Sequence, residues 1–149
     1  MYFSSYQYLK SKETILLFFL FLFSFLIRVP AIYIFGDTNL ENEWGIIVNN
    51  LSNHGKFSQV NFGDFFVPNL QMPPLYAFYL FFFKIFNFTE AIYIKSVLFS
   101  QIIISSFSVI IFYLINKIFF SKRISILGTI IFSLFPIHIY ACTQISSVI

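Results

Sequence analysis

The chain has 149 residues, of which 58% are apolar and only 10% are charged, and its mean hydropathy is +0.83. A soluble domain of this length cannot bury so much apolar surface, so the composition excludes a soluble globular protein and predicts an all-α integral membrane protein. The net charge of +3 comes from scattered Lys and Arg without a basic patch. This distribution argues against nucleic acid as a partner and favours the lipid bilayer.

Residues 1–13 are polar and carry Lys10 and Lys12, and an apolar segment follows over residues 14–35. About 20 apolar residues suffice to cross a bilayer, so this segment is predicted to be the first transmembrane helix. The two lysines place the N-terminus in the cytoplasm. Because no small-residue cleavage site follows the apolar run, we expect an uncleaved span of the inner or plasma membrane.

Residues 36–73 form the predicted first outer loop, which holds four of the six acidic residues. Within it, apolar side chains recur at spacings of three and four, at Leu40, Trp44, Ile47, Val48 and Leu51. This periodicity predicts an amphipathic surface helix over residues 40–53, lying in the headgroup plane with Trp44 at the interface. The following stretch, residues 56–68, is expected to be a loop that rests on lipid or on other protein.

The segment over residues 74–87 is apolar but short, which favours a re-entrant or interfacial helix over a spanning one. Charge supports this interpretation, because residues 117–123 carry three cations that then face the cytoplasm. The predicted chain therefore has three transmembrane helices. They lie at residues 14–35, 91–116 and 124–142, with a cytoplasmic loop at 117–123 and an outer end at 143–149.

Three carboxylates lie close together where the amphipathic helix begins: Asp37, Glu41 and Glu43. A carboxylate at a membrane surface can act as a general base toward an acceptor hydroxyl or amine, or can hold a divalent cation beside a phosphate. Acids in the first turn of a helix also stabilise its positive end, so a purely structural role is the alternative. No set of residues with metal-ligand spacing appears, and the sequence names no cofactor beyond such a cation.

Several segments in order resemble the start of the GT-C membrane glycosyltransferases of the protein O-mannosyltransferase and aminoarabinose-transferase type. They are Arg28 at the end of the first span, GDTNLENEWGIIVNNLSNHG, MPPLYAFYLFFFKIF, Lys95 where the family often has Arg, and SKRISILGTIIFSLFPIHIYACTQ. The resemblance implies an enzyme that uses a polyprenyl-phosphate-linked sugar as donor. It covers roughly the N-terminal third of such an enzyme, so we expect a fragment or a truncated gene product.

The resemblance also implies site residues. The family's catalytic acid lies in the first outer loop, typically in an Asp-Glu pair followed by an aromatic residue. A comparison without gaps matches Glu41 to its Glu, Trp44 to its aromatic residue and Leu40 to its Asp, so the catalytic role falls to Glu43, Glu41 or Asp37. The Pro-Pro motif lies beside the same site in the family. This implies substrate-binding roles for residues Trp44, Pro73, Pro74, Tyr76 and Lys95.

Two other functional classes remain open from the sequence. One is a membrane accessory or binding subunit, or a decayed gene fragment, whose outer helix contacts a partner without catalysis. The other is part of a transporter, for which the second span offers only Gln101 and a few serines that are typical of helix packing.

Overall fold

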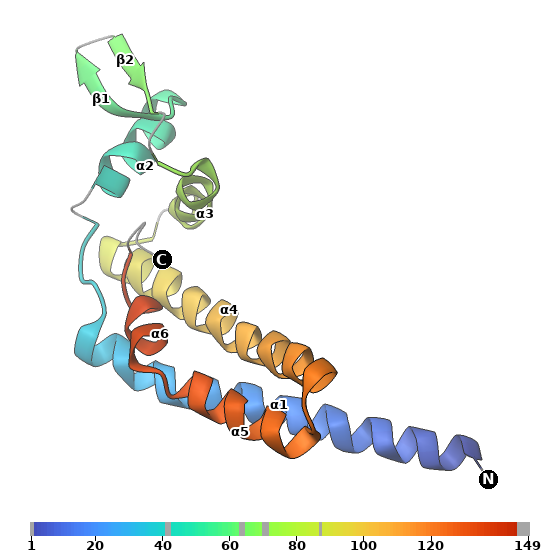
Figure 1. Ribbon diagram of the computed structural model, residues 1–149. Coiled ribbons are helices and arrows are strands. Elements are labelled where there is room, and N and C mark those ends of the chain that lie inside the picture. Colours follow the sequence, from blue (N-terminus) through green and yellow to red (C-terminus); the bar gives the residue numbers. More distant parts are fainter. Residues whose placement is uncertain (1, 41–42, 63–64, 70–71, 87, 146–149) are drawn as a thin grey trace. The chain divides into compact units, whose positions relative to one another are not determined.

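The computed structural model describes residues 2–40, 43–62, 65–69, 72–86 and 88–145 (Figure 1). Its elements are α1 (Tyr2–Phe35), α2 (Glu43–His54), β1 (Ser58–Phe62), β2 (Phe65–Pro68), α3 (Pro74–Lys84), α4 (Glu90–Phe119), α5 (Lys122–Ser133) and α6 (Pro136–Ala141). The chain is mostly helical, as predicted, but it also contains a β-hairpin that the sequence analysis does not predict.

The chain divides into two compact units. We call Met1–Phe35 with Gln101–Thr143 the helix unit, and Gly36–Ser100 with Gln144–Ile149 the loop unit. The loop unit therefore contains the whole of the predicted outer loop and the first three turns of α4.

Two described helices are long and apolar enough to cross a membrane: Lys12–Phe35 within α1, and α4. Only 22% and 28% of their most apolar windows are buried inside the structure. The core helix of a soluble protein would be largely covered by its own chain, so these surfaces suit lipid as their solvent. The sequence predicts three transmembrane helices. Among the described residues, two helices are long and apolar enough to cross a membrane, so the prediction of three is not confirmed.

Within the helix unit, α1 and residues 101–119 of α4 run antiparallel. Near the beginning of α1, Glu13 forms an ion pair with Lys117 near the end of α4. Further along, the rings of Phe21 and Phe107 lie with their centroids 4.9 Å apart. The N-terminus of α1 and the C-terminus of α4 therefore lie on the same side of this unit.

The predicted third span, residues 124–142, is two helices rather than one. α5 ends at Ser133, and α6 begins with Pro136 in its first turn after Phe135 in an extended conformation. Proline lacks an N–H donor and its ring clashes with the preceding turn, so Pro136 begins a helix instead of continuing one. At 12 residues, α5 is about 18 Å long, which is too short to cross a bilayer alone.

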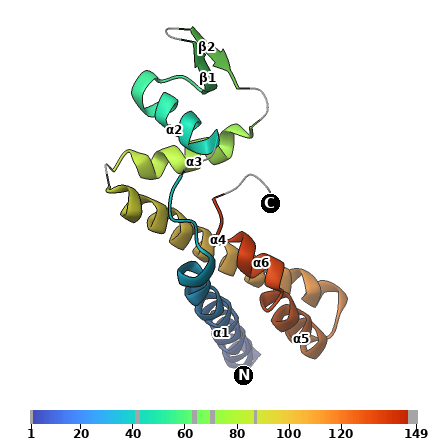
Figure 2. The same cartoon turned by 90° about the vertical axis from the view of Figure 1, so that its left-hand side faces the viewer.

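The loop unit is built around α2, which lies between α3 and β1 (Figure 2). Its buried apolar side chains come from three helices and from the chain after α6. They are Trp44, Ile47 and Val48 of α2, Ala77 and Leu80 of α3, Tyr93, Ile94, Val97 and Leu98 of α4, and Ile145. The helix predicted over residues 40–53 thus has its described part at Glu43–His54, and its apolar face is covered by protein. α2 ends at Gly55, whose φ of 63° lies in the left-handed region that glycine adopts without strain.

The β-hairpin occupies the stretch expected to be an irregular loop. Val60 pairs with Val67 in antiparallel register, and a bulge lies between Ser58 and Val60. The buried Asn50 side chain of α2 donates a 2.9 Å hydrogen bond to the backbone carbonyl of Ser58. This bond fastens the hairpin to α2, which matters because an isolated two-stranded hairpin is marginally stable in water.

Candidate functional site

The two candidate acids that the structure describes, Asp37 and Glu43, have different surroundings. Asp37 lies between α1 and α2, is half-buried, and its Oδ2 accepts a 2.6 Å hydrogen bond from the backbone N–H of Ile145. Glu43 is exposed in the first turn of α2. Glu41 lies outside the described residues, so its predicted role has no structural counterpart here.

The two described acids differ in whether their carboxylates are already hydrogen-bonded within the chain. The carboxylate of Asp37 is engaged by the chain after α6 and joins two segments that are distant in sequence. Within the part of the chain that the structure describes, no hydrogen bond or ion pair engages the carboxylate of Glu43. Glu43 lies in the first turn of α2 and is exposed, so its carboxylate is accessible from outside the chain.

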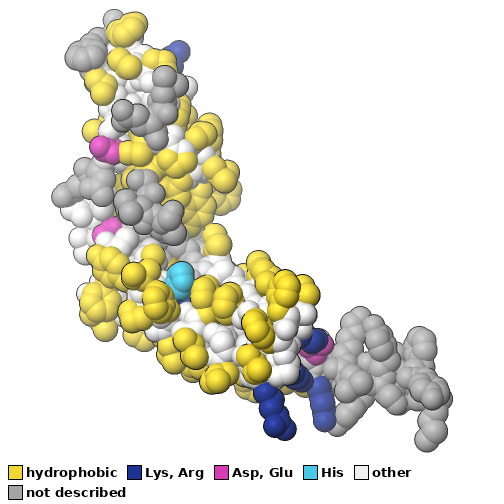
Figure 3. Space-filling view, viewed as in Figure 1, with side chains coloured by type: hydrophobic (Ala, Val, Ile, Leu, Met, Phe, Trp, Pro, Cys, Tyr) yellow, Lys and Arg dark blue, Asp and Glu magenta, His cyan; other side chains and the backbone are white. Residues whose placement is uncertain are grey.

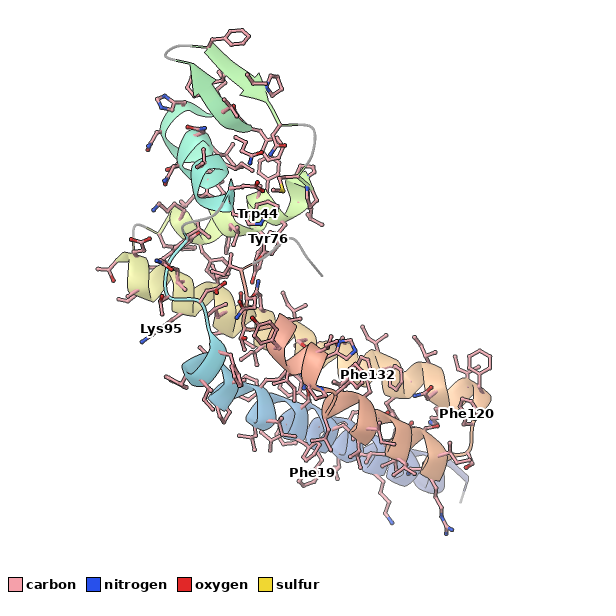
Figure 4. All side chains as sticks on the ribbon, turned by 60° about the vertical axis from the view of Figure 1, so that its left-hand side comes forward. Phe19, Trp44, Tyr76, Lys95, Phe120 and Phe132 are labelled. Carbon is pink, nitrogen blue, oxygen red and sulfur yellow. The ribbon has the colours of Figure 1, made fainter. Side chains whose placement is uncertain are left out.

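The acidic segment and the Pro-Pro segment meet through an aromatic pair (Figure 4). The Trp44 indole, 2% exposed, and the Tyr76 ring have centroids 4.9 Å apart and cross at 78°. Such an edge-to-face arrangement is a favourable geometry for aromatic rings. Since Trp44 directly follows Glu43, this pair fixes the acidic end of α2 to the first turn of α3.

The two prolines set where α3 begins. Pro73 is the N-cap with φ −64° and ψ 123°, and Pro74 occupies the first helical turn. Proline is well suited to this position, because the first N–H groups of a helix have no intrahelical acceptor in any case. Both proline side chains are exposed, and the turn that they begin carries Tyr76, the partner of Trp44.

A second set of contacts fastens α3 to the first turns of α4. The Tyr79 hydroxyl donates to the carbonyl of Val97 at 3.2 Å and is hydrogen-bonded to Ser100 Oγ. The buried Tyr93 hydroxyl donates to the carbonyl of Leu80 at 3.3 Å. The aromatic pair and these bonds together join α2, α3 and the beginning of α4 into one assembly.

Lys95 is not brought into this assembly. It is exposed on α4, and Figure 4 shows its side chain pointing away from the Trp44–Tyr76 pair. Of the predicted site residues, the structure therefore gathers Glu43, Trp44 and Tyr76, with the two prolines beside them.

Gly45, which the sequence pattern did not single out, lets the chain before α2 approach the first turn of this helix. A Cβ atom at this position would lie 2.2 Å from the carbonyl oxygen of Leu40, a backbone atom that cannot move independently. Gly45 therefore helps to position the segment that carries the acids. The sequence did contain a signal for this close approach: a glycine directly follows Glu43 and Trp44 at the start of the helix.

Arg28, which the sequence marks only through the family resemblance, has a structural role in the helix unit. This arginine of α1 is fully buried in the helix unit. Its Nε donates to Ser105 Oγ of α4 at 3.1 Å, and its Nη1 donates to the carbonyl and hydroxyl of Ser24. Arg28 thus connects α1 with α4, and the Cys142 thiol lies close to its guanidinium.

Among the described residues, no group of three or more His, Cys, Asp or Glu side chains is arranged to hold a metal ion. Comparison with protein-family models, with curated proteins and with solved structures gives no match.

Proposed function

We propose that the chain is the N-terminal part of a membrane glycosyltransferase that moves a sugar from a polyprenyl-phosphate carrier to an acceptor on the outer face of the membrane. The observation that carries the proposal is the Trp44–Tyr76 contact. It joins the two segments in which the resemblance is concentrated, the acidic helix start and the Pro-Pro helix start. An exposed carboxylate, Glu43, lies directly beside this junction in the sequence.

The proposal includes a topology with three spans. Because α1 and α4 are antiparallel, a chain that crosses outward through α1 and inward through α4 has residues 36–89 on the outer side. α5 and α6 then return outward together as an interrupted third span. Lys10 and Lys12 before the first span, and Lys122 and Arg123 before the third, satisfy the positive-inside rule.

Topology is tested by labelling intact cells with a membrane-impermeant maleimide. A cysteine at Asn53, exposed on α2, is expected to react, and one at Ser121, exposed between α4 and α5, is expected to react only after the cells are opened. Both cysteines are introduced into a Cys142→Ala background. Labelling of Ser121→Cys in intact cells contradicts the three-span arrangement.

The proposed mechanism is a single displacement. The Glu43 carboxylate accepts the proton of an acceptor hydroxyl or amine as that group forms a bond to the anomeric carbon of the sugar. The bond between this carbon and the carrier phosphate breaks, and the phosphate leaves with the electron pair, so the configuration at the carbon inverts. Asp37, already engaged by the backbone of Ile145, has the role of holding the acidic segment in place.

Transfer is measured with membranes that contain the chain, or any longer product of its reading frame, and a radiolabelled polyprenyl-phosphate sugar. Glu43→Gln is expected to reduce transfer by at least 100-fold, since general-base catalysis typically contributes about 10²–10⁴. The matched control is Asn49→Ala, also exposed on α2, which should leave transfer unchanged. Full activity of Glu43→Gln at equal protein level rejects Glu43 as the base.

A second function, a non-catalytic binding subunit, is favoured by one observation. The side chains of Val60, Phe65 and Val67 are exposed on the hairpin, and the register places all three on one face. A partner protein on the outer side would cover this face. Photo-crosslinking from Phe65 in cells tests this: a discrete crosslinked protein, together with wild-type growth of Glu43→Gln cells, favours the binding subunit.

A further inference from the structure

Arg28 is enclosed by the helix unit, yet its hydrogen-bonding capacity is only partly used. The side chain is 0% exposed, and its Nε and Nη1 groups donate to Ser105 and Ser24. Its Nη2 carries two further N–H donors, and no acceptor for them lies among the residues that the structure describes. Because buried polar groups are normally hydrogen-bonded, this nitrogen is a position for one more acceptor.

The charge of Arg28 also has no counter-charge in its own unit. A guanidinium stays protonated in proteins, and a charge enclosed away from water is costly unless an opposite charge lies beside it. The sequence of the helix unit contains one acidic residue, Glu13, which forms an ion pair with Lys117. Glu13 and Arg28 are about 22 Å apart along α1, so Glu13 cannot serve both cations. The acceptor that suits Nη2 is therefore an anion.

The depth of Arg28 along α1 decides which kind of anion fits. The apolar part of α1, Lys12–Phe35, is about 36 Å long, slightly more than a hydrocarbon core of about 30 Å. From Arg28 to Phe35 the helix rises about 10 Å, so in a centred span the backbone of Arg28 is about 7 Å inside the core.

The side chain of Arg28 does not extend to the nearer membrane surface. It bonds to Ser24, one turn deeper in the span, whereas arginines near the end of a span commonly reach outward to the interface. Lipid phosphates lie outside the hydrocarbon core. A carboxylate on another membrane-spanning helix is therefore the anion that fits the depth and direction of this guanidinium.

The cover over Arg28 includes α6 and the residue that follows it. α6 contacts α1, and the Cys142 thiol lies close to the guanidinium. None of the residues of α6 is buried, and Phe135, in an extended conformation, separates this helix from α5. Its ring contact with α1 joins two exposed side chains, Phe35 and Tyr140. α6 can therefore move away from Arg28 without uncovering a buried side chain of its own.

We propose that Arg28 binds a carboxylate on a membrane-spanning helix of a partner protein, and that α6 moves aside when this helix docks. The partner helix is apolar, because the helix unit itself has an apolar exterior: Figure 3 shows hydrophobic side chains over this unit and its visible Lys and Arg gathered at one end. It carries one Asp or Glu at the depth of Arg28.

A second copy of the chain is not this partner. In the same orientation, its helix unit offers only Glu13, which lies about 22 Å from the level of Arg28 and is already paired. Docking through Arg28 is an assembly step in the membrane, and it does not depend on glycosyltransferase activity.

Two synthetic peptides test the charge requirement on the unchanged chain. Each is an apolar helix of Leu and Ala, about 24 residues long, with either Glu or Gln about seven residues from one end. The chain is held on a resin in dodecylmaltoside micelles, and binding of the fluorescent peptides is titrated. The Glu peptide is expected to bind at least about tenfold more tightly, since hydrogen bonds between charged groups are stronger than neutral ones.

Two variants locate the binding of the Glu peptide. Arg28→Gln is expected to remove the difference between the peptides, whereas Arg123→Gln, at an exposed arginine of α5, should preserve it. A difference that survives Arg28→Gln means that the glutamate pairs with another cation, and it overturns the proposal. Equal binding of both peptides by the unchanged chain overturns it without any variant. Loss of the difference on addition of phosphatidylglycerol means that a lipid headgroup reaches Arg28, which contradicts the assigned depth.

Cys142 reports the movement of α6. It is the only cysteine of the chain and is 5% exposed, so its alkylation by N-ethylmaleimide is expected to be slow. Saturation with the Glu peptide should accelerate the reaction several-fold, and the Gln peptide at the same concentration should leave its rate unchanged. An unchanged rate with the Glu peptide bound means that α6 stays in place, and it overturns the proposed docking.

Discussion

The helix unit and the loop unit differ in the share of polar side chains that they bury. Seven of the nine polar residues that are buried in the described chain belong to the helix unit: Ser24, Arg28, Ser106, Ser125, Thr129, Ser133 and Thr143. In the loop unit the two buried polar residues, Asn50 and Ser58, accompany an apolar core around Trp44. The exposed surface of the helix unit is rich in Phe, Ile and Leu side chains, whereas α2 of the loop unit exposes mainly polar groups.

The difference indicates which solvent each unit meets. In lipid, apolar side chains gain nothing by moving inward, so helices associate through small and polar residues at their contacts. In water the apolar side chains provide the driving force and must be covered. The loop unit also exposes apolar side chains, on the hairpin at Val60, Phe65 and Val67 and on α3 at Leu75, Phe78 and Phe82.

The largest expected effect is the loss of the apolar core of the loop unit. Trp44→Ala removes a fully enclosed ring and its contact with Tyr76, which we expect to cost about 3–5 kcal/mol. Hydrogen exchange of the α2 and α3 amides measures this, with Ile46→Ala, half-exposed on the same helix, expected to change stability by less than about 0.5 kcal/mol. Equal protection in the two variants would mean that the loop unit does not depend on a water-type core.

The polar core of the helix unit is tested by Arg28→Ala. The change leaves a cavity and removes the bonds to Ser24 and Ser105, and we expect a loss of about 3 kcal/mol in unfolding by a denaturing detergent. Arg28→Lys restores the charge without the planar fork and should recover only part of the loss. Arg123→Ala, exposed on α5, is the control that should have no effect, and a harmless Arg28→Ala contradicts the role of buried polar contacts.

Two glycines give the sharpest paired test of the units. Gly45→Ala forces a Cβ against the Leu40 carbonyl and is expected to cost about 1–3 kcal/mol through the backbone shift. At Gly128 in α5 the nearest atom, Asn116 Nδ2, is 3.7 Å from a new Cβ, so Gly128→Ala should be neutral or stabilising by up to about 1 kcal/mol. Thermal unfolding of both variants measures the difference, and the same sign for both would contradict the assigned close approach.

The smallest effect is expected at the Glu13–Lys117 pair. Both side chains are partly exposed, at 33% and 40%, so water and salt screen the attraction. Lys117→Met should lower the unfolding temperature slightly in low salt and not at all in about 1 M salt, where the screening length is about 3 Å. A large loss that persists in high salt would show that the pair is a structural requirement of the helix unit.

The sequence predicted the elements that are determined by the length of apolar segments or by the spacing of apolar residues. It missed the elements that depend on tertiary contacts. Apolar length indicated the two long helices, α1 and α4. The hairpin over Ser58–Pro68 was missed because its phenylalanines suggested a surface loop, and its support by the Asn50 side chain is not visible in the sequence. The third span was predicted as continuous although Pro136 is compatible with a new helix start.

The sequence predicted which residues belong to the candidate site, but not what each of them contacts. The spacing of Asp37 and Glu43 drew attention to both, yet only their surroundings distinguish an acid engaged by a backbone N–H from an exposed one. The partners of Trp44 and Gly45 lie in other segments or in the preceding turn, so hydrophobic pattern alone assigned Trp44 to lipid.

The buried arginine sets an order of events during synthesis. Arg28 can bond to Ser24 as soon as α1 forms, but Ser105 lies 77 residues further along the chain. At roughly 5–20 residues per second, the ribosome needs about 4–15 seconds to make that partner, and longer to make Cys142. During this interval the guanidinium of Arg28 has only the carbonyl and hydroxyl of Ser24 as partners, both in α1 itself. The bond between α1 and α4 therefore forms only after most of the chain has been made.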